Sequence, residues 1–168
     1  MELFARPAHT LLEMQFLQRA HDRIPRCGNE RPFEIMYSVT KTISFCYGHR
    51  LLNYSGKCKH LHGHNGRVEI HLKTKKLDHR GMVVDFGDVK TIVKGFIDRE
   101  LDHKMILCDK DSMVPILKAR NEPYFLMKEN PTAENIAKLI YDFAKAKNLP
   151  VISVRLWETD TSFAEYNG

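Results

Sequence analysis

Alternation of apolar and polar residues marks several stretches of this chain as β-strands. Residues 34–46 alternate loosely and are rich in β-branched and aromatic side chains, whereas residues 67–75 alternate apolar with polar positions. Side chains two apart in a strand share a face, so the second stretch is typical of a strand with one buried face. The stretches 151–158 and 162–166 predict two further strands.

Apolar residues at helical spacing predict two main helices. The first follows Asp88, whose side chain can cap it, and runs to about Glu100, with Asp85 holding the loop before it. The second follows Thr132, another candidate cap, and runs to about Lys147. The expected buried positions are Val89, Ile92, Val93, Phe96, Ile97, Ile136, Leu139, Ile140 and Phe143.

The remaining segments complete the predicted order. Residues 82–84 are expected to continue the sheet, and the polar insert after residue 108 leads into a short strand at 124–127. Antiparallel strand pairs with helices on one face make an α+β sandwich of two layers. An amphipathic helix is also predicted within residues 8–23. We therefore divide the chain into an N-terminal helical extension, residues 1–32, and a main domain, residues 33–168.

Composition narrows the class of protein. The 168 residues are 43% apolar and 28% charged, and no apolar run approaches the ~20 residues that span a bilayer. The chain start lacks the layout of a signal peptide, and the four cysteines lack the spacing of a disulfide scaffold, so we expect reduced thiols and a cytoplasmic location. The net charge of +5 is too mild and dispersed for a nucleic-acid partner, but it suits an anionic small molecule.

Candidate chemistry gathers between residues 49 and 71. In an extended chain, residues two apart lie on the same face, so the side chains of His62 and His64 project together. His60 lies on that face too. His49 follows a strand-like run that can pair beside this stretch. Three histidines with an open fourth position are typical of a catalytic zinc. Two alternatives stay open here, a closed structural site that adds Cys58 and a solvated surface cluster.

Six short motifs extend this picture along the chain. They are FCYGHRL at 45–51, GKCKHLHGHN at 56–65, VDFGDVK at 84–90, LDH at 101–103, PTAEN at 131–135 and WET at 157–159. In this order they resemble the signature of the 6-pyruvoyltetrahydropterin synthase/6-carboxytetrahydropterin synthase family. The resemblance covers roughly residues 34–166.

The resemblance implies a fold and an assembly. It implies the tunnelling fold, a two-layer sandwich whose antiparallel sheet carries two main helices on one face. Sheets from several subunits then close into an oligomeric β-barrel, as a trimer or a hexamer, with sites between subunits. Pairing across subunits would also remove open sheet edges.

The resemblance also implies roles for individual residues. His49, His62 and His64 would hold Zn²⁺, which binds the side-chain hydroxyls of 7,8-dihydroneopterin triphosphate. Cys58 would be the general base, with its pKa lowered by neighbouring lysines and the metal. Asp102 would orient His103 for proton transfer. Substrate contacts would come from Glu158, whose carboxylate suits the N–H edge of a pterin, and from Thr132.

Two activities share these parts. One cleaves the substrate side chain, releases acetaldehyde and gives 6-carboxytetrahydropterin, on the route to queuosine; the other eliminates triphosphate and gives 6-pyruvoyltetrahydropterin. Only three residues separate Cys58 from His62, and this short loop resembles the 6-carboxy enzymes, which we therefore favour. A more distant alternative is a non-catalytic zinc-stabilised binding protein. Arg50, Lys104 and Lys118 are candidates for the triphosphate path.

Overall fold

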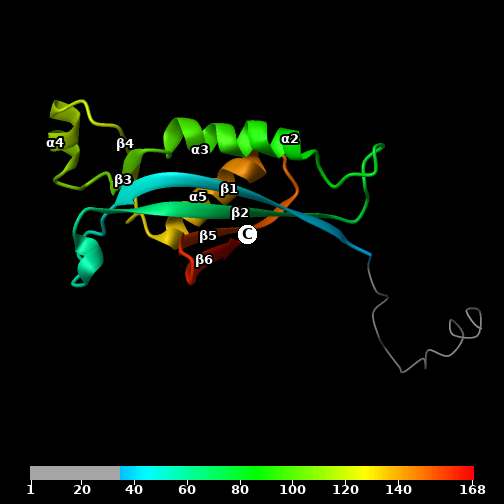
Figure 1. Ribbon diagram of the computed structural model, residues 1–168, viewed down its shortest axis with the longest axis horizontal. Helices are drawn as coiled ribbons and strands as arrows, with labels where there is room; N and C mark the ends of the chain where they lie inside the picture. Colours follow the sequence, from blue (N-terminus) through cyan, green and yellow to red (C-terminus); the bar gives the residue numbers. More distant parts are fainter. Residues whose placement is uncertain (1–34) are drawn as a thin grey trace, which may run out of the picture. The chain divides into compact units, whose positions relative to one another are not determined.

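The computed structural model describes residues 35–168, and within this range the chain forms a six-stranded sheet with helices packed against it (Figure 1). The predicted extension over residues 1–32 and its helix lie outside the described residues, so this division of the chain stays a prediction. The elements in chain order are β1 (Tyr37–His49), the 3₁₀ turn η1 (Lys57–Lys59), β2 (His62–Thr74), α2 (Phe86–Val89), the π-helical segment η2 (Lys90–Lys94), α3 (Gly95–Glu100), β3 (Lys104–Cys108), α4 (Val114–Ala119), β4 (Tyr124–Met127), α5 (Ala133–Ala146), β5 (Val151–Thr159) and β6 (Ser162–Asn167).

The long strands β1 and β2 form the central ladder of the sheet. Each has 13 residues, and they pair antiparallel from Tyr37 opposite Thr74 to His49 opposite His62. The alternation predicts shorter strands because glycine has a low β propensity and interrupts the pattern where Gly48 faces Gly63. The ladder therefore continues into the histidine-rich stretch, beyond the ends of the two predicted strands.

The sheet is mixed, with the strand order β4-β3-β1-β2-β5-β6. β3 pairs in parallel with both β1 and β4, so the expectation of a wholly antiparallel sheet is wrong at this edge. Residues 104–108 form a short apolar run directly after a helix, and periodicity cannot identify such a run as a strand. The strand expected at 124–127 is confirmed as β4, whereas residues 82–84 lie outside the strands.

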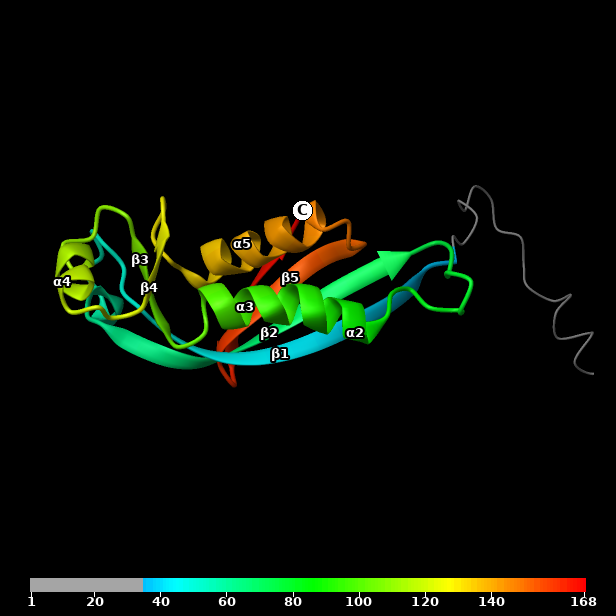
Figure 2. The same ribbon diagram turned by 90° about the horizontal axis from the view of Figure 1, so that it is seen from above.

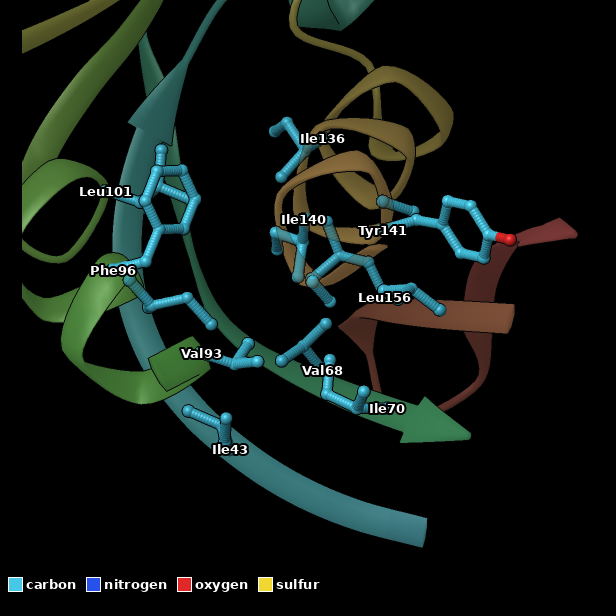
Figure 3. Packing of buried hydrophobic residues seen from close by; sticks show 14 of the residues in the cluster. Ile43, Val68, Ile70, Val93, Phe96, Leu101, Ile136, Ile140, Tyr141 and Leu156 are labelled. Atoms are coloured by element: carbon cyan, nitrogen blue, oxygen red, sulfur yellow. The ribbon is translucent and has the colours of Figure 1, made fainter. Parts of the chain in front are cut away.

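Helices cover one face of this sheet (Figure 2). α2, η2 and α3 follow one another without a break and lie beside α5. Their apolar side chains meet the inward-facing residues of β1, β2 and β5, as Figure 3 shows. The predicted helix faces are confirmed: Val89, Val93, Phe96, Ile97, Ile136 and Ile140 are buried, and Ile92, Leu139 and Phe143 are half-buried.

The two main helices also contact each other. The rings of Phe96 and Phe143 stack with their centroids 4.1 Å apart. Burial of such a side chain stabilises the fold by about 1.5–3 kcal/mol.

Within residues 35–168, no helix is both long enough and apolar enough to cross a lipid bilayer.

The caps of the helices explain where they begin. α5 starts as predicted, because the Thr132 hydroxyl oxygen accepts a hydrogen bond from Asn135 N–H at 3.4 Å. The first main helix starts earlier than predicted. Its cap is Asp85, which accepts a bond from Gly87 N–H at 2.7 Å, while Asp88 lies inside the first turn. Asp85 has the extended backbone of an N-cap, and a sequence with two aspartates three residues apart does not reveal which one adopts it.

A partly buried ion pair joins the segment before α4 to the end of β1. Arg50 donates from Nε to Asp111 Oδ2 at 2.7 Å and from Nη2 to Oδ1, and Asp111 is only 2% exposed. Burial acts to raise the pKa of this carboxyl, but Arg50 and the Met113 N–H together hold the pKa below its usual value. Arg50 is therefore engaged by a carboxylate instead of pointing freely toward a triphosphate.

We expect Asp111→Ala to lower the free energy of unfolding by about 1.5–3 kcal/mol at pH 7, because it removes the charge-assisted hydrogen bonds that Asp111 accepts from Arg50 and from the Met113 N–H. The folded-state pKa lies below the unfolded one, so the wild-type advantage is present above about pH 4 and is lost as the pH falls through the folded pKa. Urea unfolding at several pH values measures both effects. Asp142→Ala, which breaks an exposed pair with Lys138, is the control and should leave the midpoint nearly unchanged. Equal losses in the two variants would contradict the interpretation.

Candidate metal centre and adjoining cavities

Three histidines meet where β1 and β2 continue beyond their apolar part. His49 lies opposite His62, and Tyr47 lies opposite His64, so all four side chains are on the face of the ladder that carries the core. His49 Nε2 is 3.0 Å from His62 Nε2 and 3.1 Å from His64 Nε2. The ladder register therefore brings together the three side chains that the sequence analysis selected as metal ligands.

Backbone carbonyl groups orient each of the three rings. His49 Nδ1 is 2.7 Å from the Pro131 oxygen, His62 Nδ1 is 2.8 Å from the His60 oxygen, and His64 Nδ1 is 3.2 Å from the Glu158 oxygen. A carbonyl only accepts, so each Nδ1 carries the proton and each Nε2 is left with a lone pair. This is the arrangement of outer-shell partners that fixes histidines as metal ligands.

The electrostatics of this cluster favour a bound cation. His49 is 3% exposed, and burial lowers its pKa further than the Pro131 carbonyl and Glu158 raise it, with the other two imidazoles lowering it too. The Nε2 atoms of the three rings face one another at close range, which is repulsive between lone pairs unless a positive charge lies between them. Neutral imidazole nitrogens are a donor set that Zn²⁺ accepts, so the residues present fit the expected metal.

The geometry of the cluster bears on the two alternatives, a solvated surface cluster and a closed structural site that includes Cys58. His49 is buried, which disfavours a solvated surface cluster. Among the described residues, only His49, His62 and His64 bring their ligand atoms together here, and Cys58 is not one of them. His60 is exposed and contributes its carbonyl oxygen to the cluster.

A carboxylate and a phenol lie beside the histidines. Glu158 Oε1 is 3.7 Å from His49 Nε2 and 3.9 Å from His64 Nε2. Tyr47 donates its O–H to the same Oε1 at 3.1 Å. Burial, and then the charge of Glu158, raise the pKa of Tyr47. Sequence reasoning selected Glu158 but missed Tyr47, although its place two residues before His49 predicts that both share one strand face.

The cluster lies between two cavities. One, of about 310 Å³, is lined by His49, Cys58, Thr132 and Glu158 together with apolar residues of β6. This cavity thus contains the candidate base Cys58, the candidate substrate contacts Thr132 and Glu158, and the candidate metal ligand His49. The other cavity, of about 760 Å³, has a lining that includes His62, His64, His103 and Lys104.

The predicted pair of Asp102 and His103 is held by β1. Asp102 Oδ1 accepts from Cys46 N–H at 2.8 Å, and His103 N–H donates to the Cys46 carbonyl at 2.7 Å. Asp102 Oδ2 is 2.9 Å from His103 Nδ1, the contact expected of an orienting carboxylate. Partial burial acts to raise the pKa of Asp102, but the Cys46 N–H and His103 hold it below its usual value.

The structure places the proposed proton-transfer groups in different cavities. The His103 side chain is 78% exposed and its backbone has a φ of 56°, a left-handed conformation that few residues other than glycine adopt. Cys58 lies on the turn η1, whose position is fixed by a bond from Leu51 N–H to the Cys58 carbonyl at 2.8 Å. The described chain thus brings the candidate ligand His49 to one cavity with Cys58 and Glu158, but it does not bring Cys58 and His103 together.

Comparison with known proteins points to one family. A family model described as 6-pyruvoyl tetrahydropterin synthase matches residues 38–168. The 6-carboxy-5,6,7,8-tetrahydropterin synthase of Rickettsia bellii is 36% identical over 137 residues, which cover 77% of this chain and 99% of that protein. That relative and this chain are thus similar over almost the whole of the relative.

Solved structures agree on the fold. An uncharacterized protein from Wolinella succinogenes superposes with a TM-score of 0.66 at 28% identity, covering 80% of this chain and 99% of that chain. The 6-pyruvoyl tetrahydropterin synthase of Caenorhabditis elegans superposes with a TM-score of 0.61 at 23% identity, covering 80% of this chain and 96% of that chain. The second likeness shows a shared fold only.

We expect His62→Ala to lose nearly all bound metal, because it removes one of three converging Nε2 atoms. Elemental analysis of protein purified with zinc in the medium measures the occupancy. His60→Ala is the matched control, since it removes a neighbouring imidazole and keeps the backbone carbonyl that His62 uses. Full occupancy in His62→Ala, or equal loss in both variants, would remove the assignment.

Proposed function

The chain belongs to the 6-pyruvoyl tetrahydropterin synthase family, and from this we infer that it is a zinc-dependent lyase that converts 7,8-dihydroneopterin triphosphate to 6-carboxy-5,6,7,8-tetrahydropterin. The observation that carries the proposal is the convergence of three Nε2 atoms beside a cavity that also contains Cys58 and Glu158. A metal centre and a thiol at one cavity are the parts that such a reaction requires.

His49, His62 and His64 hold the zinc ion. When bound, it supplies a Lewis acid that polarises the side-chain hydroxyls of the substrate and makes the neighbouring O–H and C–H groups more acidic. The carbonyl groups behind each Nδ1 support this role, because they keep the rings in the ligating tautomer.

Cys58 acts as the general base, and Asp102 with His103 completes the proton transfer. The Cys58 thiolate takes a proton from the activated side chain of the substrate. Asp102 accepts from His103 Nδ1, which leaves Nε2 as the atom that takes or returns a proton. The short bonds between Asp102, His103 and the β1 backbone support the pair as a rigid unit.

Glu158 and Thr132 bind the pterin. The Glu158 carboxylate accepts hydrogen bonds from the amino and ring N–H groups of the pterin. The Thr132 oxygen already accepts from Asn135 N–H, so its O–H is free to donate to a substrate oxygen or ring nitrogen. Both residues line the cavity that contains Cys58.

The proposed reaction balances with one added water. The substrate and water give 6-carboxytetrahydropterin, acetaldehyde and triphosphate, and the bond between the first and second side-chain carbons breaks. The electrons that reduce the dihydropterin ring come from the first side-chain carbon, which becomes the carboxylate, so no external reductant is needed. Elimination of triphosphate without water, giving 6-pyruvoyltetrahydropterin, is the alternative.

The activity of the more similar relatives and the short loop between Cys58 and His62 both favour the 6-carboxy product. Curated relatives at 36–39% identity are 6-carboxy-5,6,7,8-tetrahydropterin synthases, whereas the structures titled 6-pyruvoyl enzymes are 18–23% identical. The loop between Cys58 and His62 is also short, as the resemblance to 6-carboxy enzymes requires. A cytoplasmic location suits a mechanism that depends on a reduced Cys58.

We infer further that the enzyme is a homo-oligomer, a trimer or a hexamer, in which His103 of one subunit serves Cys58 of another. Two observations support this inference. Cys58 and His103 line different cavities in the described chain. The edge strands β4 and β6 each have one side without a partner strand within residues 35–168, and pairing between subunits would satisfy those backbone groups.

We expect Cys58→Ala to retain zinc and to bind neopterin, because the histidines and Glu158 are unchanged. Turnover of 7,8-dihydroneopterin triphosphate should fall by roughly 10²–10⁴-fold, the usual scale of acid–base catalysis. Chromatography of the products and an assay for acetaldehyde measure the reaction. Cys108→Ala, which removes a buried thiol outside both cavities, should keep its activity. Loss of zinc in Cys58→Ala would support a closed structural site instead, and 6-pyruvoyltetrahydropterin as product would support the alternative activity.

Sharing of sites between subunits can be tested by mixing two inactive variants. Cys58→Ala and His103→Ala should each be nearly inactive, but co-expressed subunits should regain turnover, because some sites then combine an intact Cys58 with an intact His103 of a neighbour. Sedimentation should show a multiple of three subunits. A fully active monomer, or co-expressed subunits no more active than the separate variants, would contradict the shared site.

A further inference from the structure

Tyr47 is buried between the candidate metal ligands and the core. It is 3% exposed, and its ring centroid lies 5.4 Å from that of His49 and 5.6 Å from that of His64. On its other side it stacks on Phe45 at 5.2 Å. The ring is therefore fixed by packing, and its hydroxyl reaches Glu158 Oε1 at 3.1 Å.

Glu158 lies close to becoming a metal ligand itself. Two ligand atoms at 2.0–2.1 Å from a tetrahedral zinc ion lie about 3.3 Å apart. Glu158 Oε1 is 3.7 Å from His49 Nε2 and 3.9 Å from His64 Nε2, only a few tenths of an ångström beyond that separation. A carboxylate is an ordinary zinc ligand, so a small movement of Glu158 would close the fourth position that the substrate needs.

The hydrogen bond from Tyr47 opposes that movement. A phenol is protonated at neutral pH, so Tyr47 can only donate to the carboxylate and adds no negative charge of its own. The donated bond occupies a lone pair of the same oxygen that is nearest to the histidines. The Tyr47 ring is held by packing, so moving Oε1 onto the metal would stretch or bend this bond, which costs free energy.

We propose that Tyr47 is a positioning residue that holds Glu158 out of the metal coordination sphere, so that the fourth position stays open and the carboxylate stays available to the pterin. The proposal rests on the function proposed above and adds a device that separates metal binding from substrate binding. It predicts that removal of one oxygen atom from Tyr47 changes the metal site, although Tyr47 does not touch the metal.

The test is Tyr47→Phe, which keeps the packed ring and removes the hydroxyl. Co²⁺ in place of zinc reports the ligands through its visible absorption bands, and competition with a chelator measures metal affinity. We expect the Co²⁺ spectrum to change and affinity to rise by about 10–100-fold, the scale of outer-shell effects on metal sites. Binding of neopterin, followed by its fluorescence, should weaken. Tyr141→Phe is the matched control, because Tyr141 is a buried tyrosine of α5 (Figure 3) that packs against Tyr166 and lines neither of the two cavities beside the histidines.

A second substitution shows whether Glu158 causes the change. Glu158→Gln replaces the carboxylate by a neutral amide, a weaker ligand for zinc or cobalt, so Tyr47→Phe with Glu158→Gln should restore a Co²⁺ spectrum like that of the wild type. The proposal is overturned if Tyr47→Phe leaves the spectrum and the affinity unchanged. It is also overturned if metal affinity falls, because Tyr47 would then support a ligand instead of restraining one.

Failure of this proposal and failure of the proposed function give different results. The spectrum and the metal affinity do not depend on which pterin is the substrate. If wild-type protein binds Co²⁺ through the histidines but does not turn over 7,8-dihydroneopterin triphosphate, the function is wrong and the role of Tyr47 can still be read from the spectra. If turnover is normal and the Tyr47→Phe spectrum is unchanged, only the role of Tyr47 is wrong.

Discussion

The antiparallel register of β1 and β2 is the constraint on which the site depends. Because His49 lies opposite His62 and Tyr47 opposite His64, the face that buries Ile43 and Phe45 continues as a face of imidazole rings. A slip of one residue would turn one strand's side chains to the other face of the sheet and separate the ligands. The apolar part of the ladder resists such a slip, since it would expose the buried residues of the slipped strand. Packing of the apolar part of the ladder therefore fixes the geometry of the histidine cluster at the other end of the same strands.

The same ladder organises the groups that act beside the metal. The backbone of Cys46 holds Asp102 and His103 through two hydrogen bonds, and Tyr47 holds Glu158. Adjacent residues of β1 thus contact opposite ends of the site. They can do so because alternate side chains of a strand face opposite sides while the backbone bonds lie in the plane of the sheet.

Prediction from sequence succeeded where the signal is local. The buried faces of the helices followed from periodicity. Residue type and spacing drew attention to the histidines, the family resemblance implied the set of three, and the structure places the Nε2 atoms of this set together. It failed where the outcome depends on distant partners. β3 becomes a strand because it pairs with both β1 and β4, and the bond of Tyr47 joins residues 111 positions apart. Neither relationship leaves a periodic trace in the chain.

The positions of the ligands along the chain have a consequence for the order of assembly. His49 and His64 are separated by 15 residues and belong to one hairpin, whereas Glu158 is 94 residues from His64. The entropy lost on closing a loop rises with its length, so the hairpin closes at a lower cost than the contacts that bring in α3 and β5. A nascent chain therefore has a complete set of three imidazoles once the hairpin has been synthesised, long before Glu158. A metal captured at that stage would act as a folding nucleus and would favour the correct pairing of the two longest strands.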